Sequence, residues 1–105
     1  MNAHLPKWPT RTGFAKWLKA RGKKPAGTCG DAEHCALAGY CRYLNPTATF
    51  VLVDSGISLK FPNGDHDRRF SKWQENFVDR FDFHRHTGAK RTGRISGNEA
   101  LECLR

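Results

Sequence analysis

The chain has 105 residues, of which 18 are Lys or Arg and 10 are Asp or Glu, so its formal net charge at pH 7 is +8. Hydrophobic residues make up 38% of it, which is enough for one core but not for a second folded unit. No run approaches the roughly 18 apolar residues of a membrane span, and no apolar segment typical of a secretory signal follows the first residues. We therefore expect a single cytoplasmic domain, residues 1–105, with reduced cysteines.

The positive charge is concentrated in two flanking segments. Residues 1–30 contain seven Lys or Arg and no acid, and residues 83–95 contain four and no acid. Residues 31–67, in contrast, carry a net charge of −3. Because summed positive charge attracts phosphates and acidic surfaces over roughly a Debye length, about 8–10 Å, an acidic partner is the class of ligand that the composition favours.

Residues 1–30 are expected to form a basic arm followed by a helix. Two early prolines favour an extended arm, and Thr12 is a suitable N-cap for a helix over residues 13–21. This helix would bury its aromatic side chains and present its cations to solvent. Residues 22–30 contain the glycines and the proline of a loop.

Residues 31–83 are expected to form the core. Asp31 can cap a second helix over residues 32–44. Apolar residues then alternate over residues 49–54 and 56–61, which predicts a hairpin. An Asn-Gly turn follows the hairpin. The apolar face of the second strand would be formed by Ile57, Leu59 and Phe61.

The most regular periodicity predicts a third helix over residues 67–82. Its apolar side chains recur every three or four residues along one stripe, at Phe70, Trp73, Phe77, Val78 and Phe81. Residues 84–97 have the composition of a basic loop, and Asn98 can cap a short C-terminal helix over residues 98–105. The predicted fold is a small α+β domain of order α-α-β-β-α-α, with a two-stranded hairpin packed on the second and third helices.

Two stretches of the core resemble a known pattern. CGDAEHCALA begins at Cys29, and FVDRFD ends the predicted third helix, with the hairpin between them. This order is similar to that of many small uncharacterised actinobacterial and phage open reading frames, in which a Cys-led Ala/Leu helix, a hairpin and a helix ending in Phe-Asp follow one another. The resemblance implies a small α+β fold of a mobile-element kind and no particular chemistry.

Cysteine and histidine side chains raise the question of a metal site. Zinc ligands must lie within about 2.0–2.3 Å of one ion, and no CxxC pair indicates such a site here. Buried, reduced cysteines are the expected alternative. One set of ligands stays open as a zinc site, provided that the fold brings it together: Cys29, Cys35, His84 and His86.

The sequence contains no recognisable set of catalytic residues. Asp65, His66 and Asp67 form an acidic cluster, but we expect them to initiate the third helix, whose dipole favours acids at its start. A domain of this size also has little room for a large pocket. We therefore expect a binding protein without a cofactor and without enzymatic activity.

Basic side chains interleaved with aromatic ones predict a surface for nucleic acid or another acidic partner. Cations neutralise phosphates, and exposed aromatic rings can stack on bases. No helix-turn-helix, zinc-finger or RNA-recognition signature is present, so contact with the phosphate backbone is favoured over reading of base sequence. The candidate residues are Lys7, Trp8, Arg11, Lys16, Lys19, Arg21, Lys23, Lys24, Arg85, Lys90, Arg91 and Arg94.

Two other functions stay open at the level of sequence. One is a phage-type inhibitor or adaptor that docks on an acidic groove of a host protein or nucleoprotein complex, since such a groove attracts the same lysines as a phosphate track. Exposed Val51 and Val53 would favour this protein interface. The other is a small structural subunit of a virion or ribonucleoprotein assembly. The sequence distinguishes neither DNA from RNA nor one oligomeric state from another.

Overall fold

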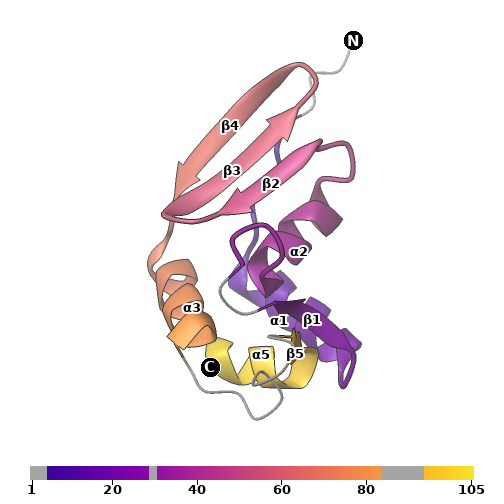
Figure 1. Cartoon of the computed structure of the whole chain (residues 1–105), viewed down its shortest axis with the longest axis vertical. Coiled ribbons are helices and arrows are strands. Elements are labelled where there is room, and N and C mark those ends of the chain that lie inside the picture. The colour runs from indigo at the N-terminus through magenta and orange to yellow at the C-terminus, as the bar shows by residue number, and fades with distance from the viewer. Residues whose placement is uncertain (1–4, 29–30, 84–93) are drawn as a thin grey trace.

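A three-stranded sheet forms one end of the molecule and a group of helices forms the other (Figure 1). The computed structural model describes residues 5–28, 31–83 and 94–105. In chain order the elements of this described part are α1 (Arg11–Arg21), β1 (Pro25–Thr28), α2 (Ala36–Leu44), β2 (Phe50–Val53), β3 (Gly56–Phe61), β4 (Gly64–Arg69), α3 (Lys72–Phe83), β5 (Arg94–Ser96) and α5 (Gly97–Leu104). They form one compact domain, and none of the described helices is long and apolar enough to cross a membrane.

The predicted hairpin is present as β2 and β3. The two strands pair antiparallel, with Val51 opposite Leu59 and Val53 opposite Ile57, and these four side chains are buried. Their alternation places one face of the sheet against α2 and leaves the other face toward solvent. The predicted α+β class and the packing of a hairpin on helices are therefore confirmed.

A third strand, β4, pairs antiparallel with β3 where the sequence predicted the start of the third helix. The helix expected over residues 67–82 begins only at Lys72, and the cluster of Asp65, His66 and Asp67 lies in β4. Residues 65, 67, 68 and 69 of this strand are exposed, so it lacks the alternation of apolar residues that identifies a half-buried strand. Its charges suit an edge strand, because they oppose pairing with another chain.

A second, two-stranded sheet joins segments that lie far apart in the sequence. The segment expected to be a loop over residues 22–30 contains β1, and the basic segment 84–97 ends in β5. The two strands pair antiparallel, with Pro25 opposite Ser96 and Thr28 opposite Arg94. Neither strand has a periodic pattern that is long enough to be recognised, since they have four and three residues.

Three N-cap residues differ from those predicted. Two of them lie two residues before the predicted cap and one lies four residues after it. In each case the side chain accepts a hydrogen bond from the backbone N–H three residues further on, which is the geometry of an N-cap. The observed caps are Thr10, Cys35 and Ser96, in place of Thr12, Asp31 and Asn98.

The core is centred on Phe14, which is fully buried. Its ring lies 5.3 Å from the ring of Tyr40 in α2 and 4.8 Å, edge to face, from that of Phe77 in α3. Trp17 and Trp73 lie slightly further away, at 6.2 and 6.1 Å. Aromatic pairs at such distances stabilise a fold beyond the area they bury, so this cluster fixes the relative positions of three helices.

Phe77→Ala tests the contribution of the predicted stripe to this cluster. Phe77 is buried against both Phe14 and Phe81, so we expect the substitution to lower the free energy of unfolding by about 3–5 kcal/mol. Urea unfolding followed by circular dichroism measures the change. Leu5→Ala, at an exposed side chain, is the control and should leave the midpoint unchanged. An unchanged midpoint for Phe77→Ala would show that the stripe is not part of the core.

Candidate functional site

A groove with an apolar floor and a cationic rim lies between α1 and α5. Its volume is about 390 Å³. The floor is formed by Ala15, Leu101 and Leu104. The remaining lining residues are Arg11, Thr12, Lys16, Lys19 and Arg105, four of which are basic. We call this feature the cationic groove.

Hydrogen bonds at both ends of the two helices hold the cationic groove in shape. At one end the backbone N–H of Asn98 donates to the carbonyl of Gly22 at 2.9 Å, and that of Gly97 donates to the carbonyl of Lys24 at 3.0 Å. At the other end the Arg11 guanidinium donates to the carbonyl of Leu104 at 2.8 Å. The start of α5 therefore meets the end of α1, and the two helices run antiparallel.

Gly97 allows the close approach of these helices. A Cβ atom at this position would lie 2.3 Å from the carbonyl oxygen of Leu18 and 2.9 Å from Cβ of Arg21. Backbone atoms cannot move aside as a flexible side chain can, so any larger residue would push α5 away from α1.

The basic side chains of α1 point away from the core, as the sequence predicted. Lys16 and Lys19 are exposed on the rim of the cationic groove, and Lys23 and Lys24 are exposed in the turn that follows the helix. Ion pairs join His34 to Asp31 and Arg105 to Glu102 among the residues that the structure describes. None of the four lysines has a carboxylate partner in that part of the chain.

Arg21 lies on a different side of α1 from the groove. Its guanidinium carbon is 4.7 Å from the centre of the Trp17 ring, and its Nε donates to the carbonyl of Pro25 at 2.9 Å. Arg21 is therefore oriented by α1 and β1 rather than extended toward the groove.

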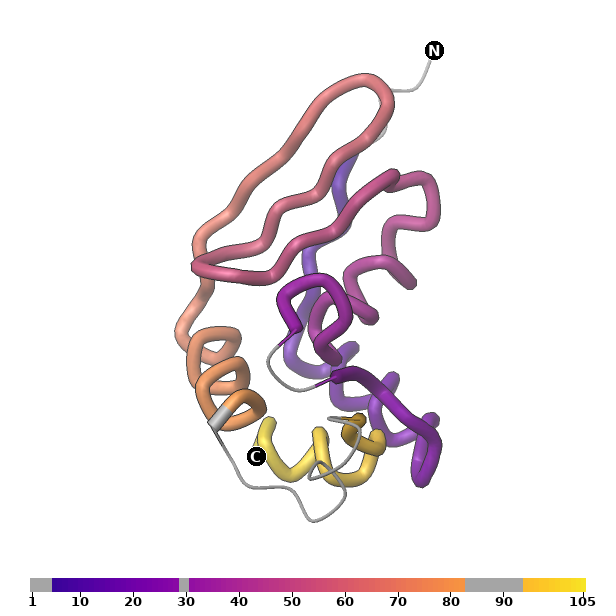
Figure 2. Tube along the Cα trace, in the orientation of Figure 1, coloured from indigo at the N-terminus to yellow at the C-terminus, as the bar shows by residue number. Residues whose placement is uncertain are grey.

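The extended basic arm before α1 is attached to the domain. Figure 2 shows the extended segment before α1 running along the side of the sheet that α2 also covers. Asn45 holds this segment, because its side chain accepts from the backbone N–H of Lys7 at 2.8 Å and donates to the carbonyl of Lys7 at 2.9 Å. Trp8 is half-buried because it packs against the core, and the Arg68 guanidinium lies 5.4 Å from the centre of its ring.

The second basic segment falls largely outside the described residues. This applies to the predicted positions Arg85, Lys90 and Arg91. Arg94, which lies in β5, is exposed opposite Thr28. The two basic segments are thus joined through the sheet of β1 and β5, but only Arg94 of the second segment is placed.

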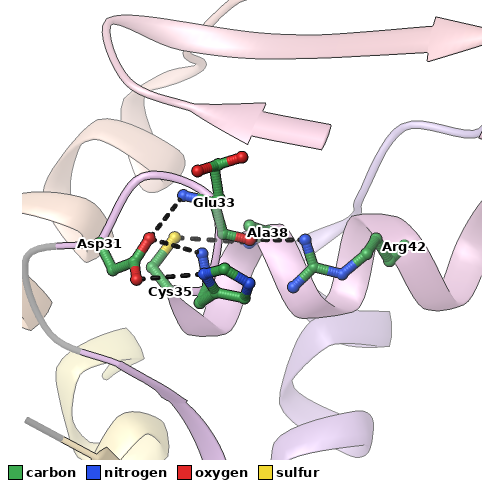
Figure 3. A network of polar contacts seen from close by, with 6 residues as sticks. Asp31, Glu33, Cys35, Ala38 and Arg42 are labelled. Carbon is green, nitrogen blue, oxygen red and sulfur yellow. Dashed lines mark hydrogen bonds and ion pairs between the residues drawn. The ribbon is translucent and has the colours of Figure 1, made fainter. Parts of the chain in front are cut away.

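Asp31 and Cys35, the second of which belongs to the open zinc set, accept hydrogen bonds around the start of α2 (Figure 3). Oδ1 of Asp31 accepts from the backbone N–H groups of Glu33 and His34 at 3.0 and 3.1 Å, and Oδ2 lies 3.1 Å from Nδ1 of His34. The Glu33 backbone hydrogen bond is the main cause that keeps the pKa of Asp31 below its ordinary value. Asp31 therefore caps the turn before α2, and the Cys35 sulfur, 3.5 Å from the N–H of Ala38, caps the helix itself.

The open zinc set is only partly described. Cys29, His84 and His86 lie outside the described residues, and Cys35 is buried. Within residues 5–28, 31–83 and 94–105 no three potential ligands gather at one point. The placed cysteine thus has a structural role as a helix cap.

The wall of the cationic groove on α5 was not found from the sequence. Leu101 and Leu104 were expected in a short helix, but nothing local indicates that this helix pairs with α1, some 80 residues earlier in the chain. Arg105 was not singled out either. Tyr43, which is exposed and lies beside Trp17, was also missed because a single aromatic residue at the end of a helix gives no periodic signal.

Gly97→Ala tests whether close packing maintains the groove. The added methyl group would collide with the backbone of Leu18, so we expect the free energy of unfolding to fall by about 1–3 kcal/mol. Thermal or urea unfolding measures this change. The neighbouring substitution Asn98→Ala, at an exposed side chain, should have little effect. Equal stability of the two variants would contradict the close approach of α5 to α1.

The buried thiols give a second prediction. Burial raises the pKa of Cys35 to about 11 and that of Cys41 to about 12, so only about a thousandth of the Cys35 thiols, or fewer, are ionised at pH 8. In a Cys29→Ser variant we therefore expect iodoacetamide to label Cys35 and Cys41 only after unfolding in urea. Mass spectrometry of the peptides measures the extent of labelling at each cysteine separately. Rapid labelling of either cysteine in the folded protein would show that it is accessible and reactive.

Comparison with known proteins does not assign a function to the cationic groove. No protein-family model matches the chain, and no curated protein or solved structure matches it significantly. The function is therefore inferred from the geometry and the charge of the surface.

Proposed function

We propose that the protein binds the phosphate backbone of nucleic acid through α1 and the turn that follows it, and that it acts as a binding protein rather than as an enzyme. The observation that carries this proposal is a row of exposed cations without carboxylate partners in the described part of the chain: Lys16, Lys19, Lys23 and Lys24. Such cations are free to replace the counterions that surround a nucleic-acid strand.

The row is placed by rigid structure rather than by a flexible tail. Lys16 and Lys19 are three residues apart, about 4.5 Å along the axis and just under one helical turn, so both project from the same side of α1. Gly22 ends the helix with φ 55, and its N–H donates to the carbonyls of Leu18 and Lys19. The chain therefore turns at a fixed place, and Lys23 and Lys24 continue the positive surface beyond the end of α1.

A second candidate function is the docking of an acidic segment of another protein in the cationic groove. The observation in its favour is the apolar floor of Leu101 and Leu104, which a phosphate backbone would not use. Strand β2 does not support this second function. Exposed Val51 and Val53 would have indicated a protein interface, but they are only 1% and 4% exposed. The proposal of nucleic-acid binding therefore rests on charge, and the alternative rests on the groove floor.

The salt dependence of binding tests the proposal. Fluorescence anisotropy with a short single strand and a short duplex, between about 50 and 200 mM salt, should give a linear fall of log K with log salt. Four phosphate contacts correspond to a slope of about −3 for a single strand. We expect the double variant Lys19→Gln, Lys23→Gln to reduce the magnitude of this slope by about 1.4.

The matched control removes the same charge elsewhere. Lys60 in β3 and Lys72 in α3 are exposed on other elements, so Lys60→Gln, Lys72→Gln should leave the slope close to that of the wild type. Equal slopes for both double variants would refute the assignment to α1. Absence of binding at low salt would refute nucleic-acid binding, and binding of an acidic peptide that is lost on Lys16→Gln, Lys19→Gln would then support the second candidate.

A further inference from the structure

Three aromatic side chains and one cation form a continuous strip across α1 and α2, on the side of α1 away from the cationic groove. The Trp17 ring lies 5.5 Å from the ring of Tyr40 and 6.4 Å from that of Tyr43, and the two tyrosine rings are stacked at 6.1 Å. The guanidinium of Arg21 covers Trp17 at 4.7 Å. We call this set of four residues the aromatic strip.

The aromatic strip packs against the core on one side and is exposed to solvent on the other. Phe14, which is fully buried, lies against both Trp17 and Tyr40, so these rings are held in place by the core. Tyr40 is buried, Trp17 is half-buried and Tyr43 is 66% exposed. Exposure therefore increases along the strip toward Tyr43.

Packing alone does not account for Tyr43. A single exposed aromatic residue is common on protein surfaces. This ring, however, extends a rigid aromatic array that begins in the core, and it contributes little buried area of its own. A flat ring held at the edge of such an array, beside a guanidinium, is the arrangement on which proteins stack unpaired bases.

We infer that the aromatic strip stacks on the bases of single-stranded nucleic acid while the lysines of α1 contact its phosphates. This inference rests on the proposed function and specifies its substrate class. Charge as well as shape favours nucleic acid as the ligand of the strip. Arg21 belongs to the strip, and Lys16, which is next in sequence to Trp17, belongs to the rim of the cationic groove. Consecutive residues of a helix point about 100° apart, so the two surfaces adjoin around α1.

A duplex cannot use the aromatic strip in the same way. Its bases are already stacked and paired, so only its phosphates are available to the protein unless it is opened. The lysines alone would bind single and double strands by charge. A preference for single strands that depends on the presence of bases is therefore the specific signature of the strip.

Three probes separate base stacking from phosphate contact. They are an oligothymidine of about twelve nucleotides, an abasic deoxyribose-phosphate strand of the same length, and a duplex of the same length. Anisotropy at one fixed salt concentration gives the three affinities. We expect the wild type to bind oligothymidine at least about fivefold more tightly than the abasic strand.

Tyr43→Ala should abolish most of this difference. The residue is largely exposed, so the variant should fold and melt close to the wild type, and its affinities for the abasic strand and the duplex should not change. Tyr43→Phe, which retains the ring, should bind as the wild type does. Phe50→Ala removes a partly exposed ring from the far face of the sheet and should also have no effect.

The outcomes distinguish this inference from the proposed function. Equal, salt-dependent affinities for oligothymidine and the abasic strand would overturn the stacking inference and leave phosphate binding intact. The same loss in Phe50→Ala as in Tyr43→Ala would overturn the assignment to the aromatic strip. Absence of binding to all three probes would overturn both the inference and the proposed function.

Discussion

The contact of Phe14 with aromatic rings of α2 and α3 determines how the rest of the molecule is arranged. The ring lies between Tyr40 and Phe77, so α1 is held against two helices by one side chain. Because helical residues point in fixed directions, burying Phe14 and Leu18 determines which residues of α1 face outward. The cationic groove and the aromatic strip are the two surfaces that flank this buried stripe.

The fold was predictable from the sequence where apolar residues recur at the spacing of a strand or a helix. Ile57, Leu59 and Phe61 alternate, and Phe77 and Phe81 repeat at helical spacing, so the hairpin and the body of α3 were found. The charged strand β4 was not found, because an edge strand exposed on both faces has no apolar alternation. The pairing of β1 with β5 was also not found, since short strands far apart in the chain carry no local signal.

The candidate site divides in the same way. The outward direction of Lys16 and Lys19 follows from helical periodicity, and it was predicted. The apolar floor of the cationic groove depends on α5, which packs closely on α1 at Gly97 and is hydrogen-bonded to it at both ends. Trp8 was predicted as one of the residues able to stack, and in the structure its ring is half-buried on an arm that Asn45 holds, whereas Tyr43 is largely exposed. Tertiary contacts, rather than composition, therefore move the proposed stacking surface to Tyr43.

Lysine footprinting tests the central claim, that α1 and its following turn contact the phosphates, most directly. The protein is acetylated briefly with and without a saturating oligonucleotide, and each lysine is quantified by mass spectrometry. The account predicts protection of Lys16, Lys19, Lys23 and Lys24, and unchanged modification of Lys60 and Lys72. Protection of Lys60 and Lys72 with no protection of the four lysines of α1 and its turn would contradict it.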